Sequence, residues 1–266
     1  MRKVFALIRA SWLHVLSYRL QMVFTVGGLL LGVVPLYLIS NALQPMMASS
    51  VKGEGGQYFA FLIVGLLTYA FIATAAGALH ASLATEISTG GLEALLSTPT
   101  SLPVLMAGMI GQAFTHTAFR ALILLIAAWA LGAQLVWSSL LVSLGILALL
   151  IIAYTAIGIM AASLVLAFKT TGPLPSMILG FSALLGGVYY PTTSIPGWLQ
   201  PFAQWIPLTY GLRPLRQTLL QGASIETIGA DVAILAGFAA ILLGMSAVAF
   251  GTALQYAKKK GTLAQY

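Results

Sequence analysis

Long apolar stretches, separated by short polar or glycine- and proline-containing segments, are the feature that most constrains the fold of this chain. Of its 266 residues, 60% are hydrophobic and only 6% are charged, whereas about 25% of the residues of a soluble domain are charged. A soluble domain of this size cannot bury so many apolar side chains, so we expect them to face lipid. Because backbone in lipid must satisfy its own hydrogen bonds, an all-α membrane protein is predicted. Its six expected transmembrane helices are 21–39, 58–83, 104–131, 138–168, 176–190 and 227–254, and a polar loop with Pro45, Lys52 and Glu54 is expected at 41–57.

The distribution of lysine and arginine predicts which side of the membrane the chain ends face. Six spans place both termini on one side, and cytoplasmic loops carry the excess of positive charge. With cytoplasmic termini, the inside positions are Arg2, Lys3, Arg9, Arg19, Lys169, Lys258, Lys259 and Lys260, and the outside positions are Lys52, Arg213 and Arg216. Both termini are therefore predicted to be cytoplasmic. The net charge of +7 indicates this orientation rather than nucleic-acid binding.

The residue inventory argues against several kinds of chemistry. The chain has no cysteine, so thiol catalysis, disulfides and thiolate metal sites are excluded. Its three histidines and five acidic residues are dispersed, without the spacing of a metal-binding motif. No GxxxxGK[ST] phosphate loop occurs, so the chain does not bind ATP in the P-loop manner. We therefore expect no catalytic residue, no cofactor and no metal in this chain, which is not an enzyme by itself.

A short polar segment at 86–103, EISTGGLEALLSTPTSLP, separates two apolar runs. Leu92, Leu95 and Leu96 follow the i, i+3, i+4 spacing that places side chains on one helical face. Pro99 ends the segment, because the residue before a proline is forced out of helical geometry. Two interpretations remain open: a two-turn amphipathic helix whose apolar face needs a partner, and an ordinary interhelical loop.

The first residues, 1–19, have an amphipathic pattern. Phe5, Ile8 and Trp12 recur at helical spacing, while Arg9 lies away from them or extends to the headgroups. This pattern predicts an interfacial helix on the cytoplasmic surface. For its first five residues, the frayed start of the first span is the alternative.

Two pairs of residues stand out inside the predicted spans. Gly28 and Gly32 have the GxxxG spacing that lets two helices approach closely, although single matches are common in membrane helices. His116 and Arg120 are four residues apart and share one face of the third span. An arginine at membrane depth is costly and normally faces protein or water. It contacts substrate or a charged headgroup in one interpretation, and is a structural residue in the other.

Prolines divide the segment at 191–221. Pro191, Pro196, Pro201, Pro207 and Pro214 rule out one continuous helix. Short helices are expected at 196–205 and 210–221, and neither is long enough to cross the bilayer. A broken, partly re-entrant hairpin covered by protein or water is therefore predicted between spans five and six. Its aromatic residues suit the headgroup level: Trp198, Phe202, Trp205 and Tyr210.

Two stretches resemble the permease subunits of ATP-binding-cassette type 2 exporters. The first is 86–103, with the pattern E-x(4–6)-G-x-E-x-LL-x-TP, and the second is 187–222, with GVYYP, P-x-WL and then PLTY, LR and LLQG. Together with six spans and cytoplasmic termini, the resemblance covers essentially the whole chain. It implies one transmembrane domain, 1–266, in the bacterial plasma (inner) membrane. The implied partners are two copies of a cassette ATPase that binds ATP and Mg, a second permease copy (homodimer or heterodimer) and the lipid bilayer.

The resemblance also implies roles for individual residues. The segment 86–99 would be the coupling helix that contacts the ATPase, through Glu86, Gly91, Leu92, Glu93, Leu95, Leu96, Thr98 and Pro99. The segment 1–19 would be the interface helix beside it, with Phe5, Ile8, Arg9 and Trp12. Spans one, two and five would line or close the path between protomers, with Gly28, Gly32, Tyr189 and Tyr190. The hairpin 191–221 would form the extracellular gate, with Pro191, Pro196, Trp198, Pro207, Tyr210, Arg213 and Arg216.

The function implied is outward transport of an amphipathic, lipid-linked or glycan-type substrate or a drug, driven by ATP hydrolysis in the partner. The alternative is an ion-coupled secondary transporter, a class that uses intramembrane acids and internal repeats. Here Asp231 is the only acid expected at membrane depth, and no clear repeat is visible. An intramembrane enzyme would need a convergent nucleophile and base or a metal cluster, and the sequence contains no such pattern.

Overall fold

The computed structural model describes residues 19–88, 102–168 and 174–259. Within these ranges the chain is helical and contains no strand. The longer helices are α2 (Arg19–Val51), α3 (Tyr58–Ser88), α5 (Leu102–Ala130), α6 (Leu140–Phe168), α7 (Leu174–Leu185), α9 (Pro207–Gln221) and α10 (Ile225–Lys259). Short elements connect them: η1 (Lys52–Glu54), η2 (Trp137–Ser139), η3 (Thr192–Ser194) and α8 (Gln200–Ala203).

Five of the described helical segments are long and apolar enough to cross a membrane: Val23–Glu54, Tyr58–Ser82, Ile110–Ala130, Trp137–Val165 and Ile225–Tyr256. The prediction of an all-α, multi-pass membrane protein is therefore confirmed. Helix α7 is apolar but has only 12 residues, a length of about 18 Å, and a membrane span needs roughly 30 Å. Six complete spans thus stay a prediction.

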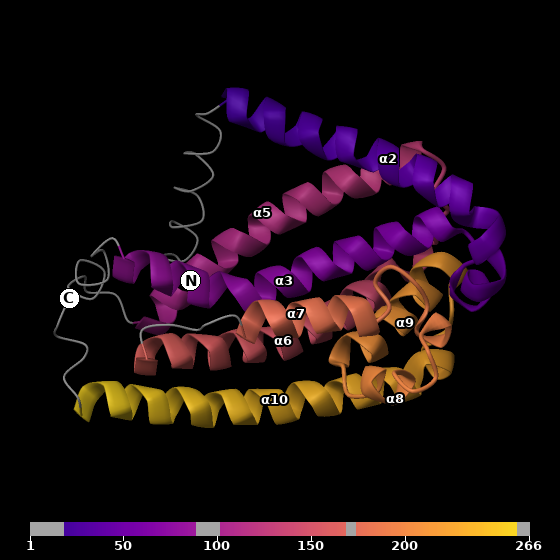
Figure 1. Ribbon diagram of the computed structural model, residues 1–266. Helices are drawn as coiled ribbons and strands as arrows, with labels where there is room; N and C mark the ends of the chain where they lie inside the picture. Colours follow the sequence, from indigo (N-terminus) through magenta and orange to yellow (C-terminus); the bar gives the residue numbers. More distant parts are fainter. Residues whose placement is uncertain (1–18, 89–101, 169–173, 260–266) are drawn as a thin grey trace.

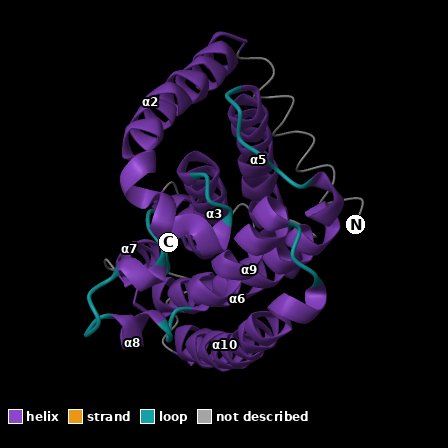
Figure 2. Cartoon of the chain, turned by 90° about the vertical axis from the view of Figure 1, so that its right-hand side faces the viewer, coloured by secondary structure: helices purple, strands orange, loops and turns teal. Residues whose placement is uncertain are grey.

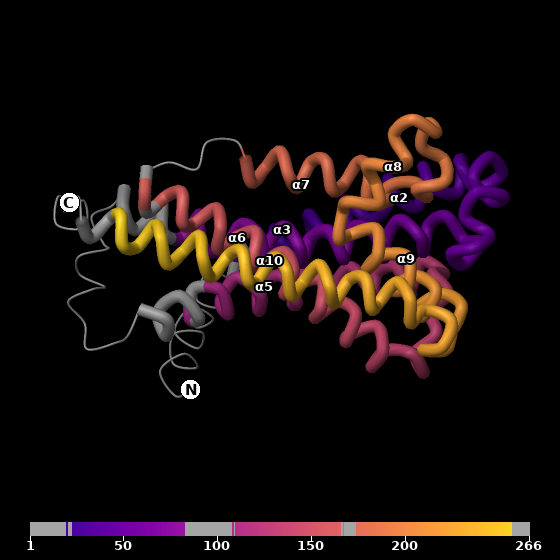
Figure 3. Tube along the Cα trace, turned by 90° about the horizontal axis from the view of Figure 1, so that it is seen from below, coloured from indigo at the N-terminus to yellow at the C-terminus, as the bar shows by residue number. Residues whose placement is uncertain are grey.

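The long helices run back and forth between two ends of the molecule (Figure 1). At the right-hand end of Figure 1, α8 and α9 gather beside the turn between α2 and α3. Seen from that end, α3 lies near the middle, with α2, α5, α6 and α7 around it and α10 beyond α6 (Figure 2). Helices α5 and α7 lie at opposite edges (Figure 3). The α9 end is therefore the place where distant parts of the chain meet.

The core lies along α3 and α6. In the most apolar window of α3, 61% of the residues are buried, against 11% for α2 and 6% for α5. Gly158 of α6 permits the close approach, because a Cβ there would lie 2.7 Å from the carbonyl oxygen of Ala75 and 2.8 Å from that of Ala76. Tyr154 is fully buried beside this contact, and its hydroxyl donates to the Ser182 hydroxyl of α7 at 2.7 Å. Helices α3 and α6 thus form the packed centre, and α2 and α5 flank it.

The prediction of a polar loop at 41–57 is wrong for most of that segment, because α2 continues to Val51. Pro45 does not end the helix, and prolines are tolerated within membrane helices. Gln44 then closes the turn: its side-chain nitrogen donates to the Gly56 carbonyl at 2.8 Å, and its side-chain oxygen accepts from the Tyr58 N–H at 2.7 Å. The polar residues that indicated a loop therefore stabilise a tight connection between two long helices.

The fifth predicted span, 176–190, is also longer than the helix found. Helix α7 ends at Leu185, and Gly187 follows in a left-handed conformation with φ of 87°. Glycine adopts this conformation without the steric cost that other residues meet. The residues from 186 to 190 consequently form a turn that leads into η3.

The predicted interface helix and most of the predicted coupling helix lie outside the described residues. Glu86 is in the last turn of α3, and the described chain resumes with α5 at Leu102. These two helix ends lie at the same end of the molecule as the start of α2 and the end of α10 (Figure 1). The ends that flank the coupling segment are therefore far from α9.

Candidate functional site at the α9 end

The proline-rich segment forms a compact cap, which we define as residues 186–222. Its backbone follows from its prolines and glycines: α9 begins at Pro207, whose fixed φ suits the first turn of a helix. Pro214 lies inside α9 without ending it, and Gly222 closes the helix in a left-handed conformation with φ of 68°. The segment is therefore several short helical pieces, of which α9, with 15 residues, is the longest.

Arg216, on α9, is the centre of the cap. Its Nε and Nη2 donate to the Phe61 carbonyl at 3.2 and 3.1 Å, and its Nη1 donates to the Gly187 carbonyl at 2.8 Å. Nη2 also donates to the Val188 carbonyl at 3.0 Å, and Nη1 donates to Glu54 Oε2 at 3.1 Å. One guanidinium thus joins α9, η1, the start of α3 and the turn after α7.

The guanidinium is taken almost completely out of solvent. Arg216 is 1% exposed, and its Cζ lies 3.3 Å from the centre of the Phe61 ring, a cation–π contact. Burial lowers the pKa of Arg216 to about 10, while the Glu54 carboxylate beside it acts in the opposite direction. The side chain therefore stays protonated near neutral pH. A buried charge of this kind needs a partner and hydrogen-bond acceptors, and the contacts above supply both.

Two glycines make room for the Arg216 cluster, which we define as Arg216 with Glu54, Phe61, Gly187 and Val188. Gly65 faces it from α3: a Cβ there would collide with the Val188 carbonyl oxygen and lie 2.6 Å from Arg216 Nη2. Gly55 follows Glu54 with φ of 112°, and a Cβ there would lie 2.6 Å from Leu220 Cβ. The close approach of α3, α9 and the first turn therefore depends on the lack of a side chain at both positions.

Other members of the predicted gate attach α9 to α10. Arg213 Nη1 lies 3.5 Å from Asp231 Oδ2, an ion pair in which the arginine side chain is 41% exposed. The Tyr210 ring lies 5.8 Å from the ring of Phe238 on α10. These contacts are more open to solvent than those of Arg216. The two arginines of the gate consequently have different surroundings, although they are three residues apart on one helix.

The remaining gate residues divide into an inner and an outer group. Pro191 and Pro207 are buried. Pro196 is exposed, Trp198 is 72% exposed, and Trp205, which was not among the predicted gate residues, is 79% exposed. Exposed tryptophans suit the headgroup level of a membrane. The cap therefore has a packed inner layer and an aromatic outer surface.

The predicted pathway residues lie on two elements that do not form one cluster. Gly28 and Gly32 of α2 are exposed, and a Cβ at either would meet no atom within 4 Å. Tyr189 is in the turn after α7, and its carbonyl accepts from the Tyr58 hydroxyl at 3.0 Å. Tyr190, the next residue, is half-buried.

His116 and Arg120 lie on α5, about one helical turn apart. Arg120 is exposed in this single chain, and the two ion pairs found within the described ranges, made by Arg213 and Arg216, do not include it. The coupling residues Gly91, Leu92, Glu93, Leu95, Leu96, Thr98 and Pro99 lie outside the described residues, as do Phe5, Ile8, Arg9 and Trp12 of the interface helix.

Sequence reasoning missed Glu54, Phe61 and Val188 as parts of the site. For Glu54 a signal existed: the chain has only five acidic residues, and a charge in an apolar protein needs an opposite charge. Phe61 and Val188 contribute backbone carbonyls to Arg216. Any residue type offers such an acceptor, and nothing in the sequence distinguishes the Phe61 ring, which makes the cation–π contact, from the other phenylalanine rings, so the sequence carries no signal for these two.

Comparison with known proteins identifies the class of this protein. The ABC-2 type transporter family matches residues 2–220, which include the cap up to Leu220 and most of the described helices. The chain therefore belongs to the ABC-2 type transporter family, whose members are membrane components of transporters. It is also similar to Nodulation protein J of Rhizobium meliloti (strain 1021), with 24% identity over 183 residues that cover 68% of this chain and 69% of the relative. Permeases of this family normally work with an ATPase subunit.

Proposed function

We propose that this chain is the permease subunit of an exporter, moving an amphipathic, lipid-linked or glycan-type substrate or a drug outward. The observation that carries the proposal is the family match over residues 2–220. ATP and Mg would bind to two copies of a separate cassette subunit. The proposal includes six spans, with α7 as part of the fifth, and both termini in the cytoplasm of a bacterial inner membrane.

Helix α3 supplies a direct connection between the two ends of the molecule. It runs without interruption from Tyr58, beside the cap, to Ser88, within the predicted coupling segment 86–99. Its 31 residues correspond to a length of roughly 46 Å. Near one end, the Phe61 carbonyl accepts two hydrogen bonds from Arg216. Movement of the coupling segment by the ATPase would therefore reach the cap through a single rigid helix.

The cap would act as the outer closure of the transport path. Arg216 ties the turn after α7 to α3 and α9, so a shift of α3 relative to α9 strains several hydrogen bonds together. A free-energy difference of a few kcal/mol between two conformers is enough to exchange their populations. ATP binding that favours one position of α3 would thus open or close the cap.

A second permease copy would cover the exposed side of α2. Only 11% of the most apolar window of α2 is buried in the single chain, and Gly28 and Gly32 are on its surface. Small residues at GxxxG spacing let a second helix approach closely. This supports an assembly that contains two permeases. The family match over residues 2–220 favours this assembly over the ion-coupled alternative.

The test addresses coupling to the ATPase. Leu95→Asp and Leu96→Asp each place a charge on the predicted contact face, and Ala94→Asp is the matched control off that face. The complex of the permease with its ATPase is reconstituted in vesicles, and ATP hydrolysis and transport are both measured. We expect transport to fall at least about tenfold in the two leucine variants, equivalent to about 1.4 kcal/mol, while the control remains active. Normal coupled transport in both leucine variants would overturn the coupling role.

A further inference from the structure

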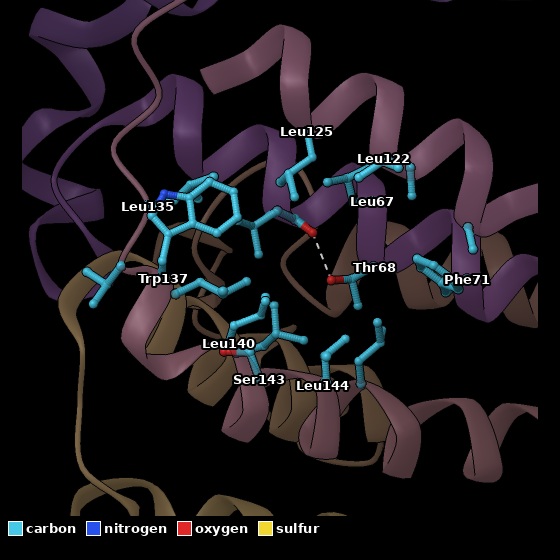
Figure 4. A pocket seen from close by; sticks show the side chains of 17 residues that line it. Leu67, Thr68, Phe71, Leu122, Leu125, Leu135, Trp137, Leu140, Ser143 and Leu144 are labelled. Atoms are coloured by element: carbon cyan, nitrogen blue, oxygen red, sulfur yellow. Dashed lines mark hydrogen bonds between the residues drawn. The ribbon is translucent and has the colours of Figure 1, made fainter. Parts of the chain in front are cut away.

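An apolar groove of about 220 Å³ lies between α5 and α6, with α3 behind it (Figure 4). It is separate from the Arg216 cluster. Leu215 and Leu219 of α9 close it at the cap end, together with the connection between α5 and α6. The principal side chains are Leu67 and Phe71 of α3, Leu122 and Leu125 of α5, and Leu140 and Leu144 of α6.

The hydroxyls that line the groove are already engaged. Thr68 donates to the Val64 carbonyl at 2.8 Å, the bond drawn in Figure 4. Ser143 donates to the Ser139 carbonyl at 2.9 Å and also lies 2.8 Å from the Thr218 hydroxyl. A buried water needs two to four polar partners, and a sugar or charged group buried without partners costs several kcal/mol. The groove therefore selects an apolar occupant.

The groove opens sideways toward lipid. Leu122 and Leu144, among its lining residues, are 55% and 50% exposed, and both lie in segments apolar enough to cross a membrane. The α5 wall includes two alanines, Ala118 and Ala121, whose small side chains leave space between the helices. The groove is thus continuous with the lipid-facing surface of these spans.

The groove is short enough to lie within one leaflet. On α5 it extends from Ala118 to Leu125, a rise of about 10 Å along the helix. The hydrocarbon of one leaflet is about 15 Å thick, half of the bilayer value. Trp137, in η2 just before α6, lines the groove at its cap end and is half exposed. Tryptophan prefers the headgroup level, so the groove runs from that level into the leaflet.

We propose that this groove holds one acyl chain of a bilayer phospholipid, from the leaflet on the α9 side of the molecule. An unbranched hydrocarbon chain fits the apolar lining, the sideways opening and the direction along the helices. The bound acyl chain would fill the space between α5 and α6. Leu215 of α9 also lines this space. The proposal requires only that these helices span a membrane, so it is independent of the transport proposal.

The experiment measures retained phospholipid by native mass spectrometry of the purified full chain during stepwise removal of lipid by detergent. Ala121→Phe fills the groove from the α5 wall. Ala236→Phe, the same substitution at an exposed position on α10, is the matched control. We expect wild type and the control to retain one phospholipid per chain under conditions in which Ala121→Phe retains none. Ala121→Phe should need at least about tenfold more added phosphatidylglycerol or phosphatidylethanolamine for half occupancy.

A second variant covers the case in which Ala121→Phe fails to fold. Ala118 is exposed and lines the groove, so Ala118→Phe enters the groove without displacing packed side chains, and the same loss of lipid is expected. Phospholipid retention equal to wild type in the folded groove variants would overturn the proposal. It would also be overturned if Leu122→Cys formed disulfides between two copies in the membrane, because a second copy would then cover the groove.

Discussion

The surroundings of Arg216 and Arg120 show how one residue type serves two different purposes in an apolar chain. Arg216 is 1% exposed and donates to three carbonyl groups and one carboxylate. Arg120 lies in the middle of α5, within a segment apolar enough to cross a membrane, and is exposed in the single chain. Arg216 holds four segments together, whereas Arg120 faces outward from the helix that carries it.

The difference teaches that burial and acceptors, rather than membrane depth alone, decide what an arginine does. A guanidinium with all its donors engaged fixes a structure, because moving it would leave polar groups unpaired. A guanidinium that faces outward is available for a ligand or a second chain. We therefore expect substitutions near Arg216 to act on folding, and substitution of Arg120 to act on transport.

The largest effect is expected from Arg216→Met. The variant removes one partner of a buried ion pair. Glu54 and the carbonyls of Phe61, Gly187 and Val188 then lose the hydrogen bonds that Arg216 donates to them. Loss of one member of such a pair costs about 3–5 kcal/mol. Chemical or thermal unfolding in detergent measures the change. Arg216→Lys should recover only part of it, since an ammonium lacks the planar fork of donors. Wild-type stability in Arg216→Met would show that the cluster does not hold the cap together.

Gly65→Ala tests the packing around Arg216 from the side of α3. The new Cβ would collide with the Val188 carbonyl and lie 2.6 Å from Arg216 Nη2. Overpacking of this kind costs about 1–3 kcal/mol. Gly77→Ala is the matched control in the same helix, because a Cβ there meets nothing within 4 Å. Equal unfolding midpoints for the two variants would contradict the close approach of α3 to the cap.

Arg120→Ala tests the outward-facing arginine. We expect stability within about 0.5 kcal/mol of wild type, as for other substitutions of exposed residues. If Arg120 contacts an anionic group, loss of a charged hydrogen bond of about 1.5–3 kcal/mol should lower transport by at least roughly tenfold. Arg120→Lys should keep part of the transport. The measurement compares transport per folded molecule with expression, and an equal loss of both would favour a structural role.

The smallest effect is expected from Arg213→Met, which removes the half-exposed pair with Asp231. Exposed ion pairs contribute about 0–1 kcal/mol, and salt should weaken this one. Unfolding measured at low and high salt should show a difference from wild type only at low salt. A loss as large as that of Arg216→Met would mean that solvent exposure does not separate the two arginines.

Much of the helical layout was predictable from hydrophobic runs, because lipid forces each run to be a helix. The start of α3 at Tyr58 agrees with the prediction, and the bounds of α5 and α6 agree within two residues. The prediction of a loop at 41–57 was wrong, because in a soluble protein Pro45 and the polar side chains would indicate the end of a helix. Here the helix continues, and the Gln44 side chain forms hydrogen bonds with the backbone of the turn that follows. The small number of acidic residues signalled that Glu54 needs an opposite charge, but its partner Arg216 was not predictable, because the two residues are 162 positions apart. The predicted coupling segment is not tested by the described residues.

The direct backbone contact at Gly158 has a consequence for how the helix bundle can change shape. Between most packed helices, side chains change rotamer and absorb small displacements. At Gly158 the α6 backbone lies directly against the Ala75 and Ala76 carbonyls of α3, so no side chain intervenes. The two helices should then tilt together, and spin labels on the halves of α3 and α6 that lie away from the cap should keep a constant separation through a full cycle of ATP turnover in the proposed complex.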